Sequence, residues 1–221
     1  VKEELLIMKD QLDLFKECNA PCMVVAEVSG SIQGKVKIPL SKRPILNVDE
    51  WKTFYNKINE ISKYMEDSSV PLAYHHHMGT VVQSQEDTER LIDNTSDTVK
   101  LLIDTGHMMF AGGDFVKIAK DYSSRLHHVH CKDIRKDVLD MSLKNDLSFI
   151  DAFFAGAFTV PGDGCINYEN FLKILKNFNY KGWLVVEAEQ DPKKANPFEY
   201  GKIGFNHLKK IALDCGFEIT R

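Results

Sequence analysis

The sequence lacks three features, and each absence argues against a class of protein. No stretch approaches the roughly 18 consecutive apolar residues of a transmembrane helix, so we expect no association with membranes. The 28 basic residues are outnumbered by 32 acidic ones, giving a formal net charge of −4. That balance argues against binding to nucleic acid. No GxGxxG motif follows any apolar run, which argues against a dinucleotide-binding fold.

Cysteine is also scarce, with five residues scattered along the chain. Cys18 and Cys22 are separated by three residues, without a second such pair to build a zinc knuckle. The charged, helix-like start of the chain does not resemble a secretory signal. We therefore expect reduced thiols and a cytoplasmic protein.

With 221 residues and 43% hydrophobic content, the chain can bury a sizeable core, and we expect residues 1–221 to form a single domain. Short apolar runs that suit strands alternate with amphipathic helices. The five runs lie at residues 21–30, 72–80, 99–107, 126–133 and 182–189. Strict alternation without a sign of antiparallel hairpins predicts a parallel sheet covered by helices. Two architectures fit this pattern, an open doubly wound sheet and a (β/α)8 barrel.

Capping residues and apolar spacing define the predicted helices. Asn47, Ser84 and Asn167 are candidate N-caps, and residues 198–215 form the last helix. That last helix carries the apolar residues Ile203, Phe205, Leu208 and Ile211. Residues 134–158 show no clear periodicity, and we expect a long excursion with some helix.

Four of the five predicted strands end in side chains suited to metal binding or acid–base chemistry. These are His75 and His77, Asp104 and His107, His128 and His130 with Lys132 and Asp133, and Glu187 with Glu189. Taken alone, Asp104 could form a turn and His107 could cap a helix. In a parallel α/β fold, however, the carboxyl ends of the strands meet at the ligand-binding edge. Their coincidence at this edge therefore predicts a functional site.

Strand geometry divides the three consecutive histidines into two sets. Side chains alternate along a strand, so His75 and His77 should share one face and His76 should face the helix layer. We expect His76→Ala to keep most activity.

Two carboxylates with one or two imidazoles suit Mn²⁺, Co²⁺, Mg²⁺ or Zn²⁺, and the absence of thiolates argues against structural zinc. Such an ion can stabilise an enolate, with a carboxylate or histidine as the base.

Several segments resemble known families. Asp104–His107, His128–Asp133 and Trp183–Glu187 resemble the xylose-isomerase-like superfamily of sugar isomerases, epimerases and dehydratases. Residues 25–29, 74–80, 158–165 and 186–192 more closely resemble the inosose dehydratase family. The resemblance implies a (β/α)8 TIM barrel of the xylose-isomerase-like type, with the chain as its C-terminal part, strands four to eight. About three βα units, roughly 70–80 residues, would then precede Val1, and the chain alone should be poorly stable, with open edge strands.

The resemblance also implies a reaction and a metal site. The reaction is metal-dependent removal of water from 2-keto-myo-inositol (scyllo-inosose) in inositol catabolism, so the expected partner is a small polyol ketone. Asp104, His130 and Glu187 match metal ligands of the superfamily, and His75 stands where a fourth ligand, a glutamate, is expected. His75, a water molecule or Glu27 could complete the shell. Mn²⁺ or Co²⁺ is expected, with Mg²⁺ and Zn²⁺ as alternatives, and a homo-oligomer is compatible with this assignment.

Further residues receive roles from the same resemblance. His77 and Glu187 are candidate bases, and His107 and Lys132 are expected to take part in catalysis. The expected substrate contacts are Glu27, His107, Lys132, Arg135 and Glu189. Three alternatives stay open: a sugar isomerase or epimerase using the same metal, an endonuclease of abasic DNA, and a non-catalytic copy. The acidic charge argues against the endonuclease.

Overall fold

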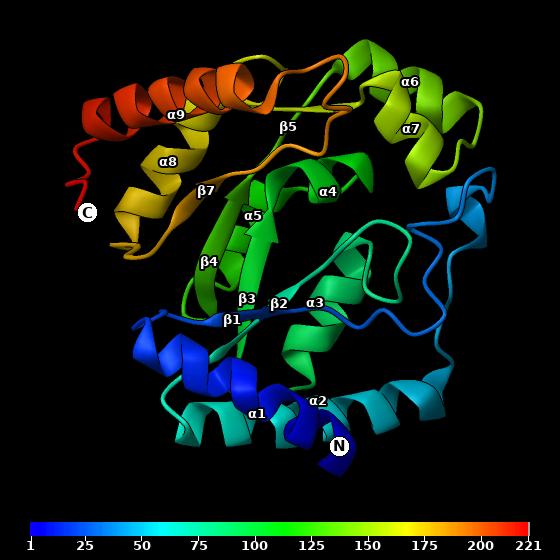
Figure 1. Ribbon diagram of the computed structural model, residues 1–221, viewed down its shortest axis with the longest axis vertical. Helices are drawn as coiled ribbons and strands as arrows, with labels where there is room; N and C mark the ends of the chain where they lie inside the picture. The colour runs from blue at the N-terminus through cyan, green and yellow to red at the C-terminus, as the bar shows by residue number, and fades with distance from the viewer. Residues whose placement is uncertain (221) are drawn as a thin grey trace.

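A curled parallel sheet forms the centre of the computed structural model, which describes residues 1–220 (Figure 1). Five strands pair in the order β1-β2-β3-β4-β7. Their bounds are Met23–Val25 (β1), Leu72–His75 (β2), Val99–Asp104 (β3), Leu126–Cys131 (β4) and Leu184–Val186 (β7). The order never reverses, whereas a doubly wound sheet reverses at a switch point. The sheet therefore corresponds to part of a barrel wall, as the resemblance predicted.

Nine α-helices and one 3-10 turn are described within residues 1–220. They are α1 (Lys2–Glu17), η1 (Leu40–Lys42), α2 (Val48–Asp67), α3 (Gln85–Asp93), α4 (Thr105–Phe110), α5 (Phe115–Asp121), α6 (Lys136–Lys144), α7 (Phe149–Ala155), α8 (Tyr168–Asn177) and α9 (Pro197–Asp214). The side chains of Asn47, Ser84 and Asn167 accept backbone N–H groups at the first turns of α2, α3 and α8, which confirms the predicted caps. None of the described helices has the length and apolarity needed to cross a membrane.

Strand alternation divides the sheet into two faces. Leu101, Ile103, Val129 and Cys131 belong to a core under the helix layer, packed with residues of α5, α8 and α9. On the opposite face, Ala73 and Leu102 are buried two residues before the ends of β2 and β3. The parallel register sets His75 beside Leu102 and Asp104 beside His130. The side chains of the predicted site therefore lie on the face turned away from these helices, at the carboxyl ends of the strands.

The excursion between β4 and α8 differs from its prediction. It contains α6, α7 and a short antiparallel pair, β5 (Asp133–Ile134) with β6 (Phe158–Thr159). The expectation of no antiparallel pairing was therefore wrong for this segment. The pair forms because α6 and α7 turn the chain back, so that β6 passes the residues just after β4 in the opposite direction. Neither strand joins the main sheet.

Only some of the apolar residues of α9 face the core, since Leu208 is buried and Ile211 packs against the core cluster. Ile203 and Phe205 are 45% and 54% exposed, and the buried residues of α9 are Gly204, Leu208 and Ala212. A Cβ atom at Gly204 would lie 2.6 Å from Val186 Cγ1. The helix thus turns its smallest residue toward the Val186 side chain of β7, where a larger residue would not fit without a shift.

Candidate active site

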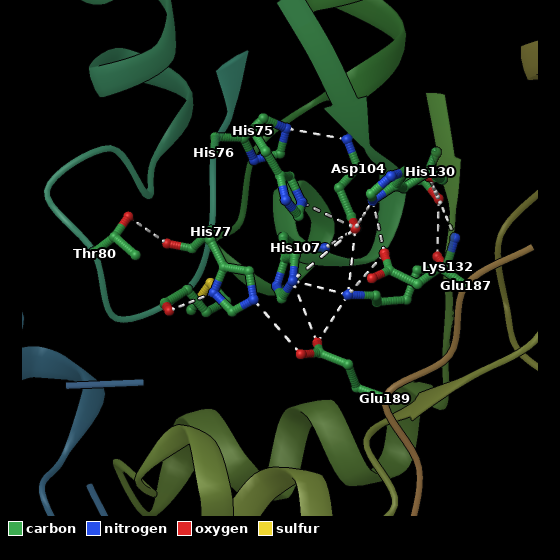
Figure 2. A network of polar contacts seen from close by, with 12 residues as sticks. His75, His76, His77, Thr80, Asp104, His107, His130, Lys132, Glu187 and Glu189 are labelled. Carbon is green, nitrogen blue, oxygen red and sulfur yellow. Dashed lines mark hydrogen bonds and ion pairs between the residues drawn. The ribbon is translucent and has the colours of Figure 1, made fainter. Parts of the chain in front are cut away.

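Four predicted ligands meet where strands β2, β3, β4 and β7 end. His75, Asp104, His130 and Glu187 each place one ligand atom within 4.8 Å of the others, and we call them the first ligand group (Figure 2). His75 and Asp104 close β2 and β3, His130 lies near the end of β4, and Glu187 directly follows β7. His75, not Glu27, is the fourth member.

The ligand atoms of this group are buried and lack hydrogen-bond partners. Among residues 1–220, seven buried side-chain polar atoms have no partner, and four of them belong one each to the first ligand group: His75 Nε2, Asp104 Oδ2, His130 Nδ1 and Glu187 Oε2.

The atoms nevertheless approach one another closely. Asp104 Oδ2 lies 3.4 Å from His75 Nε2 and 3.7 Å from His130 Nδ1, and the latter lies 2.8 Å from Glu187 Oε2. Tetrahedral metal ligands with bonds of about 2.1 Å are about 3.4 Å apart. Four buried imidazole and carboxylate atoms that face a common point fit a metal ion.

A second ligand group lies next to the first and consists of His77, His107 and Glu189. Glu189 Oε1 lies 3.5 Å from His77 Nε2, and Glu189 Oε2 lies 3.3 Å from His107 Nε2. The two imidazole rings have centroids 3.8 Å apart. His107 projects from α4, a helix that the sequence did not predict and that Asp104 caps by accepting the His107 N–H.

Lys132 lies between the two ligand groups, with its side chain fully buried. Its Nζ donates to His107 Nε2 and to Glu189 Oε2, both at 2.8 Å. The same atom is 3.3 Å from Asp104 Oδ2 and 3.3 Å from Glu187 Oε2. Figure 2 shows these contacts converging on the ammonium group. All of the proposed catalytic residues therefore come together here.

The pKa values reflect the excess of carboxylates in this small volume. Burial lowers the pKa of the His130 imidazole, but Asp104 and Glu187 outweigh burial and raise it to about 9. Burial also opposes charge on Lys132, yet Asp104, Glu189 and Glu187 raise its pKa above the ordinary value. The pKa of His107 falls well below its usual range through burial and the Lys132 charge, so this imidazole is neutral.

The tautomer of His77 follows from its surroundings. Its Nδ1 lies 2.8 Å from the Met78 carbonyl oxygen, which can only accept a hydrogen bond. Nδ1 therefore carries the proton, and in the neutral ring Nε2 presents a lone pair toward Glu189. A proton taken up at Nε2 would therefore lie beside the Glu189 carboxylate.

Two predicted substrate contacts are engaged elsewhere. Glu27 lies outside both ligand groups, and its Oε1 accepts the Ser29 N–H at 2.6 Å. Arg135 donates to the carbonyl oxygens of Gly156 and Phe158 and pairs with Asp163 at 2.6 Å. The predicted substrate contacts from Glu27 and Arg135 are therefore not among the residues that the structure brings together.

Asp133 also ended a predicted strand, but it holds backbone instead of joining the site. Its Oδ1 accepts the N–H groups of Ile134 and Ile166, and its Oδ2 accepts that of Gly162. Burial raises the pKa of Asp133, and these N–H donors oppose the rise. The carboxylate thus fixes the loop that leads to α8.

His76 takes a position that the sequence only partly predicted. It is absent from both ligand groups, as expected for the opposite face, but it is fully buried. Its Nε2 accepts the backbone N–H of Asp104 at 3.2 Å. Burial lowers its pKa to about 3, so it is neutral. His76 therefore contacts the backbone of a ligand without facing the site.

A family model described as "Xylose isomerase-like TIM barrel" matches residues 1–211. The chain belongs to this family. A rhizopine catabolism protein, MocC, of Rhizobium meliloti is 41% identical over 220 residues, covering 100% of this chain and 68% of that protein. An inosose dehydratase of Bacillus cereus is 46% identical over 190 residues, covering 85% of this chain and 64% of that enzyme. The chain thus spans about two thirds of these relatives.

Solved structures share the fold of this chain at low sequence identity. The probable 3-DHS dehydratase AsbF of Bacillus anthracis matches with a TM-score of 0.70 at 13% identity, over 94% of this chain and 70% of that one. The IOLI protein, solved with a binding zinc atom, matches with a TM-score of 0.63 at 19% identity, over 97% and 69%.

Two aromatic residues beside the site were not predicted from the sequence. The ring of Phe149 lies 5.3 Å from that of His77, and the ring of Phe158 lies 5.4 Å from that of His107. Lys132 Nζ is 5.4 Å from the Phe158 ring. Both come from the excursion that lacked periodicity, so no signal in the sequence connected them with the strand ends.

Proposed function

We propose that this chain carries the metal-binding and acid–base residues of a hydro-lyase that removes water from 2-keto-myo-inositol. The observation that carries the proposal is the convergence of four buried ligand atoms without hydrogen-bond partners from four strand ends. Similarity to relatives named inosose dehydratase supports the reaction class and the substrate. The five free thiols support a cytoplasmic location.

The first ligand group would hold the metal. His75, Asp104, His130 and Glu187 offer two nitrogens and two oxygens, a set compatible with Mn²⁺ or Co²⁺ and also with Zn²⁺. When bound, a divalent ion supplies Lewis acidity that favours charge development on a ketone oxygen. Glu187 is then a ligand, which leaves His77 as the base of the two candidates.

His77 would move the proton. In the proposed reaction the C–H bond next to the ketone breaks, its proton passes to His77 Nε2, and the electron pair becomes part of an enolate. The hydroxyl group on the next carbon then leaves and takes a proton back from Nε2–H, so that water departs without net proton uptake. Glu189, 3.5 Å from Nε2, stabilises the imidazolium formed between these two steps.

Lys132 would stabilise the negative charge of the enolate. Its ammonium is held by His107 and Glu189 beside the first ligand group, where its positive charge is already in place. Preorganised charge of this kind contributes several kcal/mol in a site shielded from water. His107, neutral and hydrogen-bonded to Lys132, positions that ammonium.

The test is an assay of the full-length protein with 2-keto-myo-inositol, following the absorbance of the dione product. We expect product only with a divalent ion present, loss of activity in His77→Ala, and normal activity in His127→Ala. His127 is a matched control because it is a histidine of β4 whose Nε2 contacts the Pro21 carbonyl oxygen instead of the site. Exchange of substrate hydrogen with solvent deuterium without any dione would identify an isomerase or epimerase and refute the proposal.

A further inference from the structure

The position of the Lys132 ammonium is fixed by the surrounding backbone. The Lys132 N–H donates to Thr105 Oγ1 at 3.1 Å, and Thr105 Oγ1 donates to the Lys132 carbonyl oxygen at 2.8 Å. A Cβ atom at Gly106 would lie 2.7 Å from Lys132 Cγ, so the stem runs in contact with α4. Because the stem is enclosed, Nζ has little freedom to leave the space between the two ligand groups.

The charges of the site define how many cations it accepts. Asp104, Glu187 and Glu189 all lie within 3.3 Å of Lys132 Nζ. The ammonium compensates one of these three negative charges, and one divalent ion in the first ligand group compensates the other two. A second divalent ion beside Lys132 would leave an excess of positive charge in a largely buried site, which is costly.

The second ligand group would be a competent metal site without Lys132. His77, His107 and Glu189 form a set of two histidines and one glutamate, which binds catalytic zinc in other folds. Lys132 Nζ lies 2.8 Å from both His107 Nε2 and Glu189 Oε2, and so it occupies the ligand atoms that a second ion would need.

We propose that the Lys132 ammonium stands in place of a second metal ion, so that the enzyme holds one divalent ion and a built-in cation beside it. The inference rests on the proposed function, because it takes the first ligand group as the metal site. It further assigns the second ligand group as a latent metal site of the His2Glu type, closed by Lys132.

The experiment measures bound metal per chain in the full-length protein, equilibrated with Zn²⁺ or Co²⁺ and freed of excess ion. We expect one ion in the wild type, two in Lys132→Ala and one in Lys132→Arg, which keeps the positive charge. The double variant Lys132→Ala/Glu189→Gln should return to one ion, because it loses a ligand of the second group. The d–d absorption of bound Co²⁺ should double in Lys132→Ala and return to the wild-type intensity in the double variant.

The outcomes separate this inference from the proposed function. One ion in Lys132→Ala, or two in the wild type, would overturn the role of Lys132 while leaving the first site in place. No ion in the wild type would overturn the metal site of the proposed function, and the inference with it. If Lys132→Ala does not fold, Lys132→Met, which fills the space of the enclosed stem without its charge, decides: two ions per chain support the inference, and one ion refutes it.

Discussion

Two buried cations lie at opposite ends of β4, and their surroundings differ. Arg125, directly before the strand, donates mainly to backbone oxygens: Val99, Ile92, Thr95 and Ser96. Lys132, directly after the strand, is surrounded by side chains that carry charge or can bind metal. Arg125 thus holds the backbone of residues 92–99, whereas Lys132 faces a cluster of ionisable side chains.

The difference shows how to separate architecture from chemistry in this fold. Carbonyl oxygens are neutral and fixed by the backbone, so Arg125 satisfies them with the several donors of its guanidinium. Within residues 1–220, four of the seven buried side-chain polar atoms without a hydrogen-bond partner belong to the first ligand group beside Lys132, and none belongs to a residue that Arg125 contacts. Unsatisfied buried groups at the carboxyl end are a cost to folding that ligand binding can offset.

The largest expected effect is on catalysis and comes from a substitution in the site at the carboxyl end of β4. Asp104→Asn keeps the cap of α4, because an asparagine oxygen can also accept the His107 N–H, but it removes the ligand charge. We expect kcat/KM to fall by about 10³-fold or more, about 4 kcal/mol, comparable to the upper figure for losing one transition-state contact. Steady-state kinetics with metal analysis would measure this, and activity within tenfold of the wild type would contradict the site.

At the amino end of β4, the expected effect of a substitution is on the stability of the fold. Arg125→Ala leaves several buried carbonyl oxygens without donors, and we expect a loss of about 3 kcal/mol in the free energy of unfolding. Urea denaturation of the full-length protein measures it, with Arg125→Lys as an intermediate control. The amount of metal bound per folded chain should stay at the wild-type value. A loss of metal binding in the folded variant would show that the two ends of β4 do not act independently.

Addition of a metal ion should stabilise the folded protein only where the site at the carboxyl end of β4 is intact. Mn²⁺ at about one hundred times its dissociation constant should raise the free energy of unfolding by about 2.7 kcal/mol, because it binds the folded state alone. Asp104→Asn should show no such rise, whereas Arg125→Ala should show the full increment despite its lower starting stability. Thermal unfolding with and without the ion tests both, and equal stabilisation of wild type and Asp104→Asn would indicate binding elsewhere.

The smallest expected effect concerns His76, which connects the site to the helix layer. His76→Ala should lower the free energy of unfolding by about 1–2 kcal/mol, since it leaves the buried Asp104 N–H without an acceptor. The folded fraction should keep most of its activity. His76→Gln, whose amide oxygen can accept that N–H, should recover part of the stability, and a loss of activity as severe as in His77→Ala would show that His76 faces the substrate.

Local patterns in the sequence were sufficient for the elements and most of the site. Alternating apolar runs and helices predicted the parallel sheet, and Asn47, Ser84 and Asn167 predicted helix starts that the structure confirms. The strand-end residues His75, Asp104, His130 and Glu187 could be grouped because parallel strands end at one edge. These inferences succeed because helix caps and strand alternation depend on neighbours close in the chain.

Tertiary contacts decided what local patterns leave open. Asp133 and Glu187 both follow apolar strands, yet the first holds a loop through backbone N–H groups and the second joins the ligand group. The enclosed ammonium of Lys132 depends on α4, β7 and the excursion meeting around it, and no spacing along the chain encodes that meeting. The sequence by itself determined which side chains reach the edge of the sheet. Only the packing of distant segments decided which of them have partners, because burial and charge compensation are properties of the assembled site.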